Sequence, residues 1–373
     1  MKVYSKVLIV LLILMAFSAG VFLYMYFFEK KERAPEDTEI SVVAARSIDE
    51  ERYKKMLEHI NTEEVLNTDL YFSAGRLKPE RTGLVSTVYN FADETFSEIY
   101  AGDSEYGYYY IDEQPENEQG IFIDKPKVVL GRQAFSPGVY LRESGGVRQL
   151  DTFHSNLDTE EYLYRIRMPR LSPSGEQYTY FAQTWLAESP EPELYNPDEW
   201  KVFLGSIDGS SREVVSGHGA QWVDENHLIY IKPDGLHMLQ IDSGETFHLV
   251  TDYAQYLSNN HIDISDDGKY VAISQPNIQG SSVSVVDIFE IELLDTKPNA
   301  AFVYRLEVDA VGGQFWPLFS PEGRYLSMQT RNISEDYSED NEIAVYDFVE
   351  RAFVATVDFN DYNFDAAFNT DWE

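Results

Sequence analysis

The chain has 373 residues and is strongly acidic, with 64 aspartates and glutamates against 29 lysines and arginines and a net charge of −35 at neutral pH. A surface of this sign repels phosphate groups, so no nucleic-acid partner is expected, whereas a cation or a basic protein is attracted. Cysteine is absent, which rules out disulfides and thiol chemistry, and the 26 tyrosines and 22 phenylalanines favour a β-rich domain.

Residues 7–28 are uncharged and mostly apolar, and as a helix they are long enough to cross a hydrocarbon core of about 30 Å. We expect a retained signal anchor here, with residues 1–6 as a short cytoplasmic tail. A cleaved signal peptide is the alternative, because small residues stand at cleavage spacing near Ala16 and Ser18, but cleavage there would leave an apolar terminus exposed. The predicted location is the cell membrane, crossed once, with the C-terminal domain extracytoplasmic.

Residues 29–75 are predicted to form a linker and an amphipathic helix. Ser47 and Glu50 fit a capping box, which makes Ser47 the N-cap of a helix that ends near Ile60. This pattern favours a helix packed on the edge or flank of the next domain, and a helix that binds a partner is the alternative. The apolar stripe of the helix consists of Ile48, Tyr53, Met56, Leu57 and Ile60.

Residues 76–373 contain a repeated turn between two strands. In the clearest copies a Ser-Pro/Asp-x-Gly turn joins a short apolar strand to a second strand of alternating pattern. These copies are LSPSGEQYTYFAQ from Leu171, ISDDGKYVAIS from Ile264 and FSPEGRYLSM from Phe319. Weaker copies are QWVDENHLIYI from Gln221, GIFIDKPKVVL from Gly120, with its turn at Asp124–Lys127, and RLKPERTGLVSTVYNF from Arg76.

The turns recur at intervals of roughly 43 to 55 residues, the length of one four-stranded propeller blade. The sequence closes with FDAAFNTDWE, which has the pattern of the first strand of another copy cut off after its turn. We therefore predict an all-β, six-bladed propeller, with seven blades as the alternative. The last strand, near Asn363–Asn369, is expected to be the inner strand of a blade whose other strands lie between Thr82 and Asp112. Such closure removes a free sheet edge.

The segments SPSGEQYTYF, SDDGKYVAIS and SPEGRYLSMQ resemble the inner-strand turns of TolB-like and related WD40-like (PD40-type) propeller repeats. The resemblance implies a propeller fold but no particular function, since propellers serve in binding, scaffolding and catalysis. A membrane helix followed by a propeller also resembles the front half of prolyl oligopeptidase-type membrane peptidases. Because no hydrolase domain follows the propeller here, this resemblance does not imply peptidase activity.

No catalytic motif is found in the sequence. The histidines form no His-x-His, His-Glu-x-x-His or zinc-finger pattern, and no nucleophile elbow, Walker loop or dinucleotide fingerprint occurs. Four histidines recur at intervals of about ten residues through one blade, where strand hairpins could bring some of them together. We nevertheless expect ordinary core or surface residues at these positions: His218, His227, His237 and His248.

Two acidic segments, Asp263–Gly268 and Ser334–Glu342, offer the oxygen ligands that calcium requires. Neither matches the EF-hand spacing, so we expect a β-turn and a solvated loop. No cofactor is predicted, and calcium is the open alternative.

Aromatic residues at two places are predicted to contact a partner. In AGDSEYGYYYIDE, strand alternation puts Tyr108 and Tyr110 on one face, where a rim strand would offer stacking to a peptide or sugar. A proline-bearing insert at residues 186–200 interrupts a blade between its second and third strands, a common place for partner contact. The alternatives are tyrosines that fill the layers between sheets and an idle surface insertion. The insert and its flank contribute Trp185, Tyr195 and Trp200.

Taken together, these patterns predict a non-enzymatic binding or scaffold module of the cell envelope. A protein partner is expected, and a glycan is a further option. The competing hypothesis is a polysaccharide- or peptide-directed hydrolase or lyase that uses acidic residues at the mouth of the propeller channel. A convergent, shielded carboxylate pair in the channel would favour the enzyme, and an aromatic or apolar patch on the rim would favour the binder. The candidate carboxylates are Asp263, Asp266, Asp267 and Asp309.

Overall fold

The computed structural model describes the chain from residue 48 to residue 372, with gaps. The chain divides into two units, residues 1–46 and 47–373; the predicted tail and anchor and most of the linker lie outside the described residues. Within the described part, no helix is long and apolar enough to cross a membrane. The described ranges are 48–66, 69–76, 84–98, 109–114, 119–123, 127–129, 132–134, 138–152, 155–156, 161–186, 200–209, 211–251, 261–275, 283–293, 297–309, 316–333, 339–358 and 364–372.

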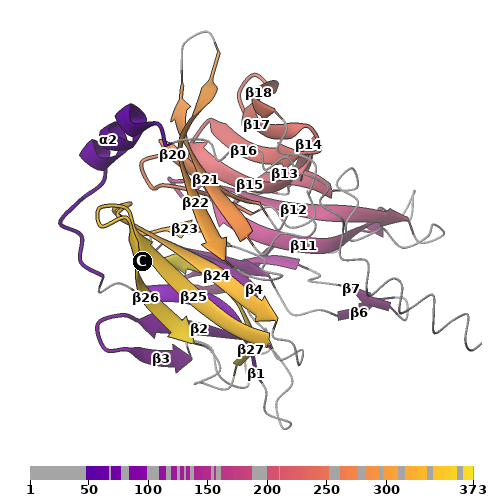
Figure 1. The fold of residues 1–373 in the computed structure, drawn as a ribbon. Coiled ribbons are helices and arrows are strands. Elements are labelled where there is room, and N and C mark those ends of the chain that lie inside the picture. Colours follow the sequence, from indigo (N-terminus) through magenta and orange to yellow (C-terminus); the bar gives the residue numbers. More distant parts are fainter. Residues whose placement is uncertain are drawn as a thin grey trace, which may run out of the picture. The chain divides into compact units, whose positions relative to one another are not determined.

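Antiparallel sheets form six blades, which are numbered here in chain order (Figure 1). Blade 1 consists of β27 (Phe364–Trp372), β1 (Asp69–Arg76), β2 (Leu84–Asn90) and β3 (Thr95–Glu98). Blade 2 consists of β4 (Tyr109–Gln114), β5 (Gln119–Ile123), β8 (Gly138–Glu143) and β9 (Gly146–Thr152), with a separate hairpin of β6 (Lys127–Val129) and β7 (Arg132–Ala134) between β5 and β8. Blade 3 consists of β10 (Ser155–Asn156), β11 (Glu161–Leu171), β12 (Gln177–Leu186), β13 (Trp200–Ser206) and β14 (Arg212–Ser216).

The remaining blades have four strands each, joined in sequence by hairpins. Blade 4 consists of β15 (His218–Asp224), β16 (His227–Lys232), β17 (Gly235–Gln240) and β18 (Glu245–Thr251). Blade 5 consists of β19 (Ile262–Ile264), β20 (Tyr270–Gln275), β21 (Val283–Glu292) and β22 (Asn299–Asp309). Blade 6 consists of β23 (Leu318–Phe319), β24 (Tyr325–Ile333), β25 (Glu339–Asp347) and β26 (Ala352–Asp358).

One strand of each blade contacts its counterparts in the two neighbouring blades. The contacts run from β4 to β11, β15, β19, β23 and β27, and β27 contacts β4 again. These six strands therefore form a closed inner ring, which confirms the prediction of six blades. The C-terminal β27 pairs antiparallel with β1, from Leu70 opposite Trp372 to Arg76 opposite Phe364, so the first and last strands share a sheet as expected.

The predicted content of blade 1 was wrong in two respects. Its other strands span residues 69–98, not Thr82–Asp112, because the inner position belongs to β27 and the ring begins at Asp69, before the expected boundary at residue 76. Strand β4, which was expected to end blade 1, is instead the inner strand of blade 2.

Three of the predicted turns do not join first and second strands. The segment after Arg76 connects the second and third strands of blade 1, and Asp124–Lys127 leads from the second strand of blade 2 into the β6–β7 hairpin. The turn expected near residue 370 is part of strand β27. The turn after Arg76 is displaced by one strand because the C-terminal β27 takes the inner position of blade 1, and the turn at Asp124–Lys127 is displaced because β4 takes the inner position of blade 2.

The Ser-x-x-Gly turn is a scaffold element with the same bonds in three blades. The hydroxyls of Ser172, Ser265 and Ser320 each accept a hydrogen bond from the backbone N–H five residues later, at 3.2, 3.0 and 2.9 Å. The glycine N–H of each turn donates to the serine carbonyl at 2.7–2.9 Å, and the glycine φ angles lie between 70° and 79°. Serine therefore caps the next strand, and glycine accepts a left-handed conformation at little cost.

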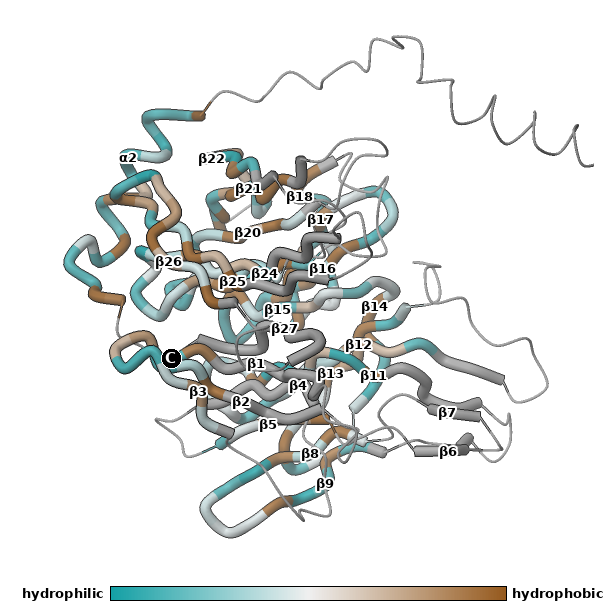
Figure 2. The backbone as a smooth tube through the Cα atoms, turned by 60° about the horizontal axis from the view of Figure 1, so that its bottom comes forward, coloured by the Kyte–Doolittle hydropathy of each residue, from teal (hydrophilic) through white to brown (hydrophobic). Residues whose placement is uncertain are grey.

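Helix α2 (Glu50–His59) packs on blades 5 and 6. Tyr53 and Met56 are buried in the core cluster of these blades, and Ile48, Leu57 and Ile60 pack against its edge, which confirms the predicted stripe and the packing role. In Figure 2 most of the helix is hydrophilic, as expected for a helix with one face against the sheets.

The start of α2 differs from the prediction. Asp49, not Ser47, is the N-cap, and its carboxylate accepts a hydrogen bond from the Arg52 N–H at 3.1 Å. Asp49 also donates its own N–H to the Val303 carbonyl at 3.1 Å. The helix is thus fixed to blade 5 at its first residue, a tertiary contact that a local capping pattern does not include.

Candidate functional site

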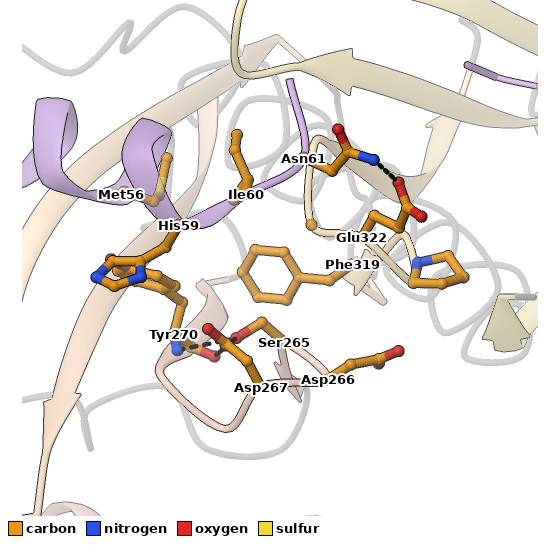
Figure 3. A pocket seen from close by; sticks show the side chains of 12 residues that line it. Met56, His59, Ile60, Asn61, Ser265, Asp266, Asp267, Tyr270, Phe319 and Glu322 are labelled. Atoms are coloured by element: carbon orange, nitrogen blue, oxygen red, sulfur yellow. Dashed lines mark hydrogen bonds between the residues drawn. The ribbon is translucent and has the colours of Figure 1, made fainter. Parts of the chain in front are cut away.

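A groove of about 320 Å³ lies between the last turn of α2 and two of the Ser-x-x-Gly turns (Figure 3). One wall is helical and contains Met56, His59 and Ile60. The other two walls are the β19–β20 turn of blade 5 and the β23–β24 turn of blade 6. The groove exists because a helix from the linker is docked across two adjacent blades, so three segments that are distant in sequence meet at one edge of the ring.

The floor of the groove is apolar and aromatic. Met56, Ile60 and Phe319 face it, and Tyr270 lies beneath His59, with 6.4 Å between their ring centroids (Figure 3). The Tyr270 side chain is 2% exposed, and its hydroxyl has no hydrogen-bond partner among the described residues. Burial raises the pKa of this hydroxyl, so it stays a neutral donor. A bound group that reached it would supply the missing partner.

The rim of the groove is acidic. Asp266, Asp267 and Glu322 are exposed there. Asp267 also shapes the turn, because its Oδ1 accepts hydrogen bonds from the Ser265 hydroxyl at 2.7 Å and from the Lys269 N–H at 3.1 Å. An apolar floor under an acidic rim suits a segment that carries an apolar side chain and a flanking positive charge.

The blade 6 wall is held by a buried glutamate from the linker. Glu64 is 6% exposed and accepts hydrogen bonds from the Ser320 hydroxyl at 2.8 Å and from the Arg324 N–H at 3.0 Å. The Glu64 carbonyl accepts two more, from the Arg324 guanidinium at 2.9 Å and from the Tyr325 hydroxyl at 3.1 Å. Burial raises the Glu64 pKa. These bonds fix the linker to the turn, so the groove is formed before any partner arrives.

A second group of polar residues lies where the inner strands of blades 3, 4 and 5 converge. It consists of Arg167 and Arg170 from β11, His218 from β15, and His261 and Asp263 in and beside β19. Asp263 accepts a hydrogen bond from the Phe319 N–H of blade 6 at 2.8 Å, and the His261 ring lies 4.3 Å from the Trp316 ring. Four blades thus contribute to one cluster near the axis of the ring.

The cluster contains one half-buried carboxyl and two neutral imidazoles. Burial raises the pKa of Asp263 to about 7, although the positive charge of Arg170 acts in the opposite direction. Burial lowers the pKa of His218 to about 4, and it lowers the pKa of His261 well below the ordinary value; Arg167 adds to both effects. A carboxyl that titrates near neutrality is suited to proton transfer, but no second carboxyl of comparable enclosure meets it among the described residues.

Several solved structures have an architecture similar to that of this chain. TolB from Acinetobacter baumannii aligns with 81% of this chain and 66% of its own, at 14% identity and a TM-score of 0.51. The chain has a TolB-like propeller fold. An oligogalacturonate lyase in complex with manganese aligns with a TM-score of 0.49, 8% identity, and coverage of 77% of this chain and 73% of the other. No protein-family model and no curated protein matches by sequence.

Other structures similar to the TolB-like propeller include a puromycin-hydrolyzing peptidase from Mycobacterium tuberculosis, with a TM-score of 0.46, 14% identity, and coverage of 77% of this chain and 43% of the peptidase. At these identities the similarity establishes the fold alone.

None of the aromatic residues predicted to contact a partner of this TolB-like propeller is a residue of the groove. Tyr108 and Tyr195 lie outside the described residues. Tyr110 and Trp185 lie in strands β4 and β12, with Trp185 opposite Tyr162 of β11. The insert itself does fall between β12 and β13, which are the second and third strands of blade 3 when the inner strand β11 is counted as the first.

Trp200 is part of the core of blade 3 and does not present a contact surface. Its side chain is 5% exposed, with the Phe181 ring packed edge-on at 5.2 Å and the Arg167 guanidinium 5.6 Å from its ring centre. Trp200 opens strand β13, and its buried side chain corresponds to the alternative of an aromatic residue that fills the layers between sheets. The expected β-turn at Asp263–Gly268 is confirmed, whereas the loop expected at Ser334–Glu342 ends inside strand β25.

The groove residues were not predicted as a site. The sequence does contain its parts, since the helix stripe ends at Ile60 and the Phe319 turn is the clearest repeat. The residue that joins them is Glu64, the second of two adjacent glutamates, and its buried contact with Ser320 does not follow from spacing. The candidate carboxylates differ in exposure: Asp263 is half-buried, whereas Asp266 and Asp267 are exposed. Asp309 is the last residue of strand β22.

Proposed function

We propose that this chain is a membrane-anchored, extracytoplasmic, non-enzymatic protein-binding module of the cell envelope. The observation that carries the proposal is the preformed groove between α2 and the turns of blades 5 and 6. The apolar segment at residues 7–28 supports the anchor and the extracytoplasmic location. A rigid TolB-like propeller supports a display role, because its rim loops are held by sheets on all sides.

The groove indicates what kind of partner segment it binds. Its apolar floor at Met56, Ile60 and Phe319 matches a single inserted aliphatic or aromatic side chain, since its volume is that of one or two residues. The exposed carboxylates of Asp266 and Glu322 match a lysine or arginine beside that anchor. The net charge of −35 acts in the same direction at longer range and raises the rate of encounter with a basic partner.

Site-specific photo-crosslinking on the full chain in its membrane tests this proposal. A photoreactive residue replaces His59, which is exposed on the groove side of α2, and in a matched control it replaces Lys54, exposed on the same helix but not part of the groove. We expect one protein adduct from position 59 and none from position 54. Equal adducts at both positions, or none at position 59, would refute the groove as the binding site.

Charge reversal then tests the recognition chemistry. Asp266→Arg and Glu322→Arg are expected to reduce the position-59 adduct at least about tenfold, since each places a positive charge against a basic segment. Asp208→Arg and Glu245→Arg change the net charge equally at exposed sites outside the groove and should leave the adduct unchanged. If all four variants act alike, the attraction is a property of the whole surface and not of the groove.

The half-buried Asp263, with its raised pKa, supports a second candidate function, a hydrolase or lyase that acts on a polysaccharide or peptide near the channel. A carboxyl with a pKa of about 7 beside two arginines could transfer a proton to or from an anionic substrate. Incubation of the purified full chain with envelope polysaccharides and peptides, followed by mass spectrometry, tests this function. Product formation that Asp263→Asn abolishes would establish it. Intact substrates, or cleavage that Asp263→Asn leaves unchanged, would exclude it.

A further inference from the structure

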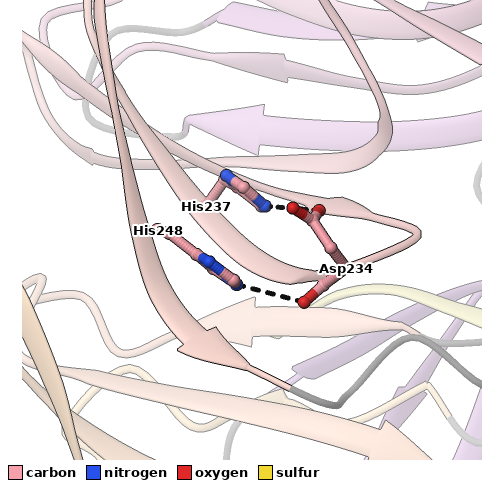
Figure 4. Close-up of side chains that lie close together, drawn as sticks. All are labelled: Asp234, His237 and His248. Carbon is pink, nitrogen blue, oxygen red and sulfur yellow. Dashed lines mark hydrogen bonds and ion pairs between the residues drawn. The ribbon is translucent and has the colours of Figure 1, made fainter.

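A cluster of two histidines and an aspartate lies on blade 4 (Figure 4) and shares no residue with the groove or with the polar group at the inner strands of blades 3 to 5. Asp234 is in the hairpin between β16 and β17. His237 is on β17, and His248 is its direct cross-strand partner on β18. The two rings are stacked, with centroids 4.5 Å apart and planes inclined by 3°. Strand register thus brings together two of the four histidines that recur along this blade.

The ring nitrogens of both histidines converge on Asp234. His237 Nε2 lies 2.7 Å from the Asp234 carboxylate Oδ1, and His248 Nε2 lies 3.0 Å from the Asp234 carbonyl oxygen (Figure 4). One potential ligand atom from each of the three residues lies within 4.8 Å of the others. His237 is 7% exposed, whereas Asp234 is exposed, so the cluster is rooted in the blade and open on one side.

The hairpin that carries Asp234 is held tightly in place. Gly235 has a φ of 139°, and a Cβ at this position would lie 1.9 Å from the Val250 carbonyl oxygen and 3.0 Å from His248 Nε2. The backbone of the hairpin therefore touches β18 directly, which only glycine allows. This contact holds the hairpin backbone that carries Asp234 against the strand of His248, while the Asp234 side chain itself is exposed.

The donor set selects a particular class of ion. Two imidazole nitrogens and one carboxylate oxygen suit Zn²⁺ and neighbouring divalent transition metals, whereas calcium and magnesium prefer sites made of oxygen alone. Around a tetrahedral ion with ligands at about 2.0–2.2 Å, ligand atoms are about 3.4 Å apart. The 2.7 Å contact between His237 and Asp234 must widen slightly, and the exposed aspartate side chain has room to do so.

We propose that Asp234, His237 and His248 form a binding site for a divalent transition-metal ion such as Zn²⁺. The ion takes the place of the hydrogen bond between His237 and the Asp234 carboxylate and of the bond from His248 to the hairpin. Its remaining coordination positions face solvent, where water or a side chain of a partner completes the shell. This site is independent of the groove, so its failure would leave the proposed function untouched.

Calorimetric titration of the metal-free full chain with Zn²⁺ tests the proposal, and Co²⁺ absorption gives a second readout of nitrogen ligation. We expect one ion per chain with a Kd in the micromolar range or tighter, and a loss of at least about tenfold in affinity for His248→Gln and Asp234→Asn. His227→Gln is the matched control, because His227 lies in the same blade and pairs with Asp224 at 2.9 Å, outside the cluster. It should bind as the unaltered chain does.

Two results would overturn the proposal. The first is the absence of binding up to about 100 µM Zn²⁺, an affinity below that of a built three-ligand site. The second is equal weakening by His227→Gln and His248→Gln, which would indicate scattered surface binding. Thermal unfolding, measured without metal and with Zn²⁺, separates an effect on folding from an effect on binding. If His248→Gln lowers the Tm without metal and Zn²⁺ leaves the Tm of the unaltered chain unchanged, the cluster only stabilises the hairpin and the proposal also fails.

Discussion

Tyr53→Ala should lower the free energy of unfolding by about 4 kcal/mol, because α2 is part of the folded core and not an attached linker. Tyr53 is 0% exposed; its ring lies 5.0 Å from the Tyr304 ring, with the Arg351 guanidinium 4.3 Å from its centre. Its hydroxyl donates to the Phe348 carbonyl. Truncation of a buried aromatic side chain to alanine costs about 3–5 kcal/mol, and the better helix propensity of alanine returns about 0.5 kcal/mol.

Tyr53→Phe separates packing from hydrogen bonding. It keeps the ring and removes only the donor to Phe348, so a loss of about 1–2 kcal/mol is expected. Lys54→Ala, at the adjacent exposed position, is the control and should change stability by less than about 0.5 kcal/mol. Urea denaturation of the full chain, followed by tryptophan fluorescence, measures all three. If Tyr53→Ala unfolds like Lys54→Ala, the helix is not part of the cooperative unit and the groove lacks a fixed wall.

Two further predictions concern a glycine in a turn and the pH dependence of stability. Gly268→Ala should destabilise the fold by more than about 2 kcal/mol, because its Cβ would lie 2.3 Å from a backbone carbonyl oxygen of blade 4. Gly244 has nearly the same φ but open space around it, so Gly244→Ala should cost only about 1 kcal/mol. Equal losses of stability in urea denaturation would contradict the clash at Gly268. The pKa of Asp263 is about 7 in the folded state, above the ordinary value of 3.8, so the folded state binds a proton more tightly than the unfolded state. The stability that this protonation contributes is therefore lost as pH rises from about 4 to 7. His218 acts oppositely, since its folded pKa of about 4 makes stability rise with pH between about 4 and 6.5. The stability of the unaltered chain minus that of Asp263→Asn should therefore fall by a few kcal/mol across pH 4–7, and a flat difference would show that Asp263 is not enclosed.

The parts of the fold that the sequence predicts are those stabilised within a few residues. The Ser-x-x-Gly turns are recognisable because each serine bonds to the backbone five residues later, so the whole motif fits in one short segment. The blade count follows from their spacing. The helix stripe is predictable for the same reason, since Tyr53 and Met56 are one turn apart on one face.

The missed features depend on pairing between distant segments. The extent of blade 1 is set by β27 against β1, and the local pattern around Arg76 does not contain that information. The pairing of His237 with His248 depends on the register of β17 and β18, including a shift between Leu236 and His237. The groove depends on the docking of α2, which Asp49 and Glu64 fix through contacts with blades 5 and 6.

The pairing of β27 with β1 has a consequence for how the molecule is made. During synthesis from the N-terminus, β1 emerges long before its inner neighbour, so blade 1 keeps an unpaired edge until the final strand is complete. Blades 3 to 6 pair sequential strands and can form as the chain lengthens, whereas the closing contact must bring together residues 69–76 and 364–372. Closure of the ring therefore requires β27, and a chain that stops before this strand keeps an unpaired edge on β1 that chaperones or proteases can recognise.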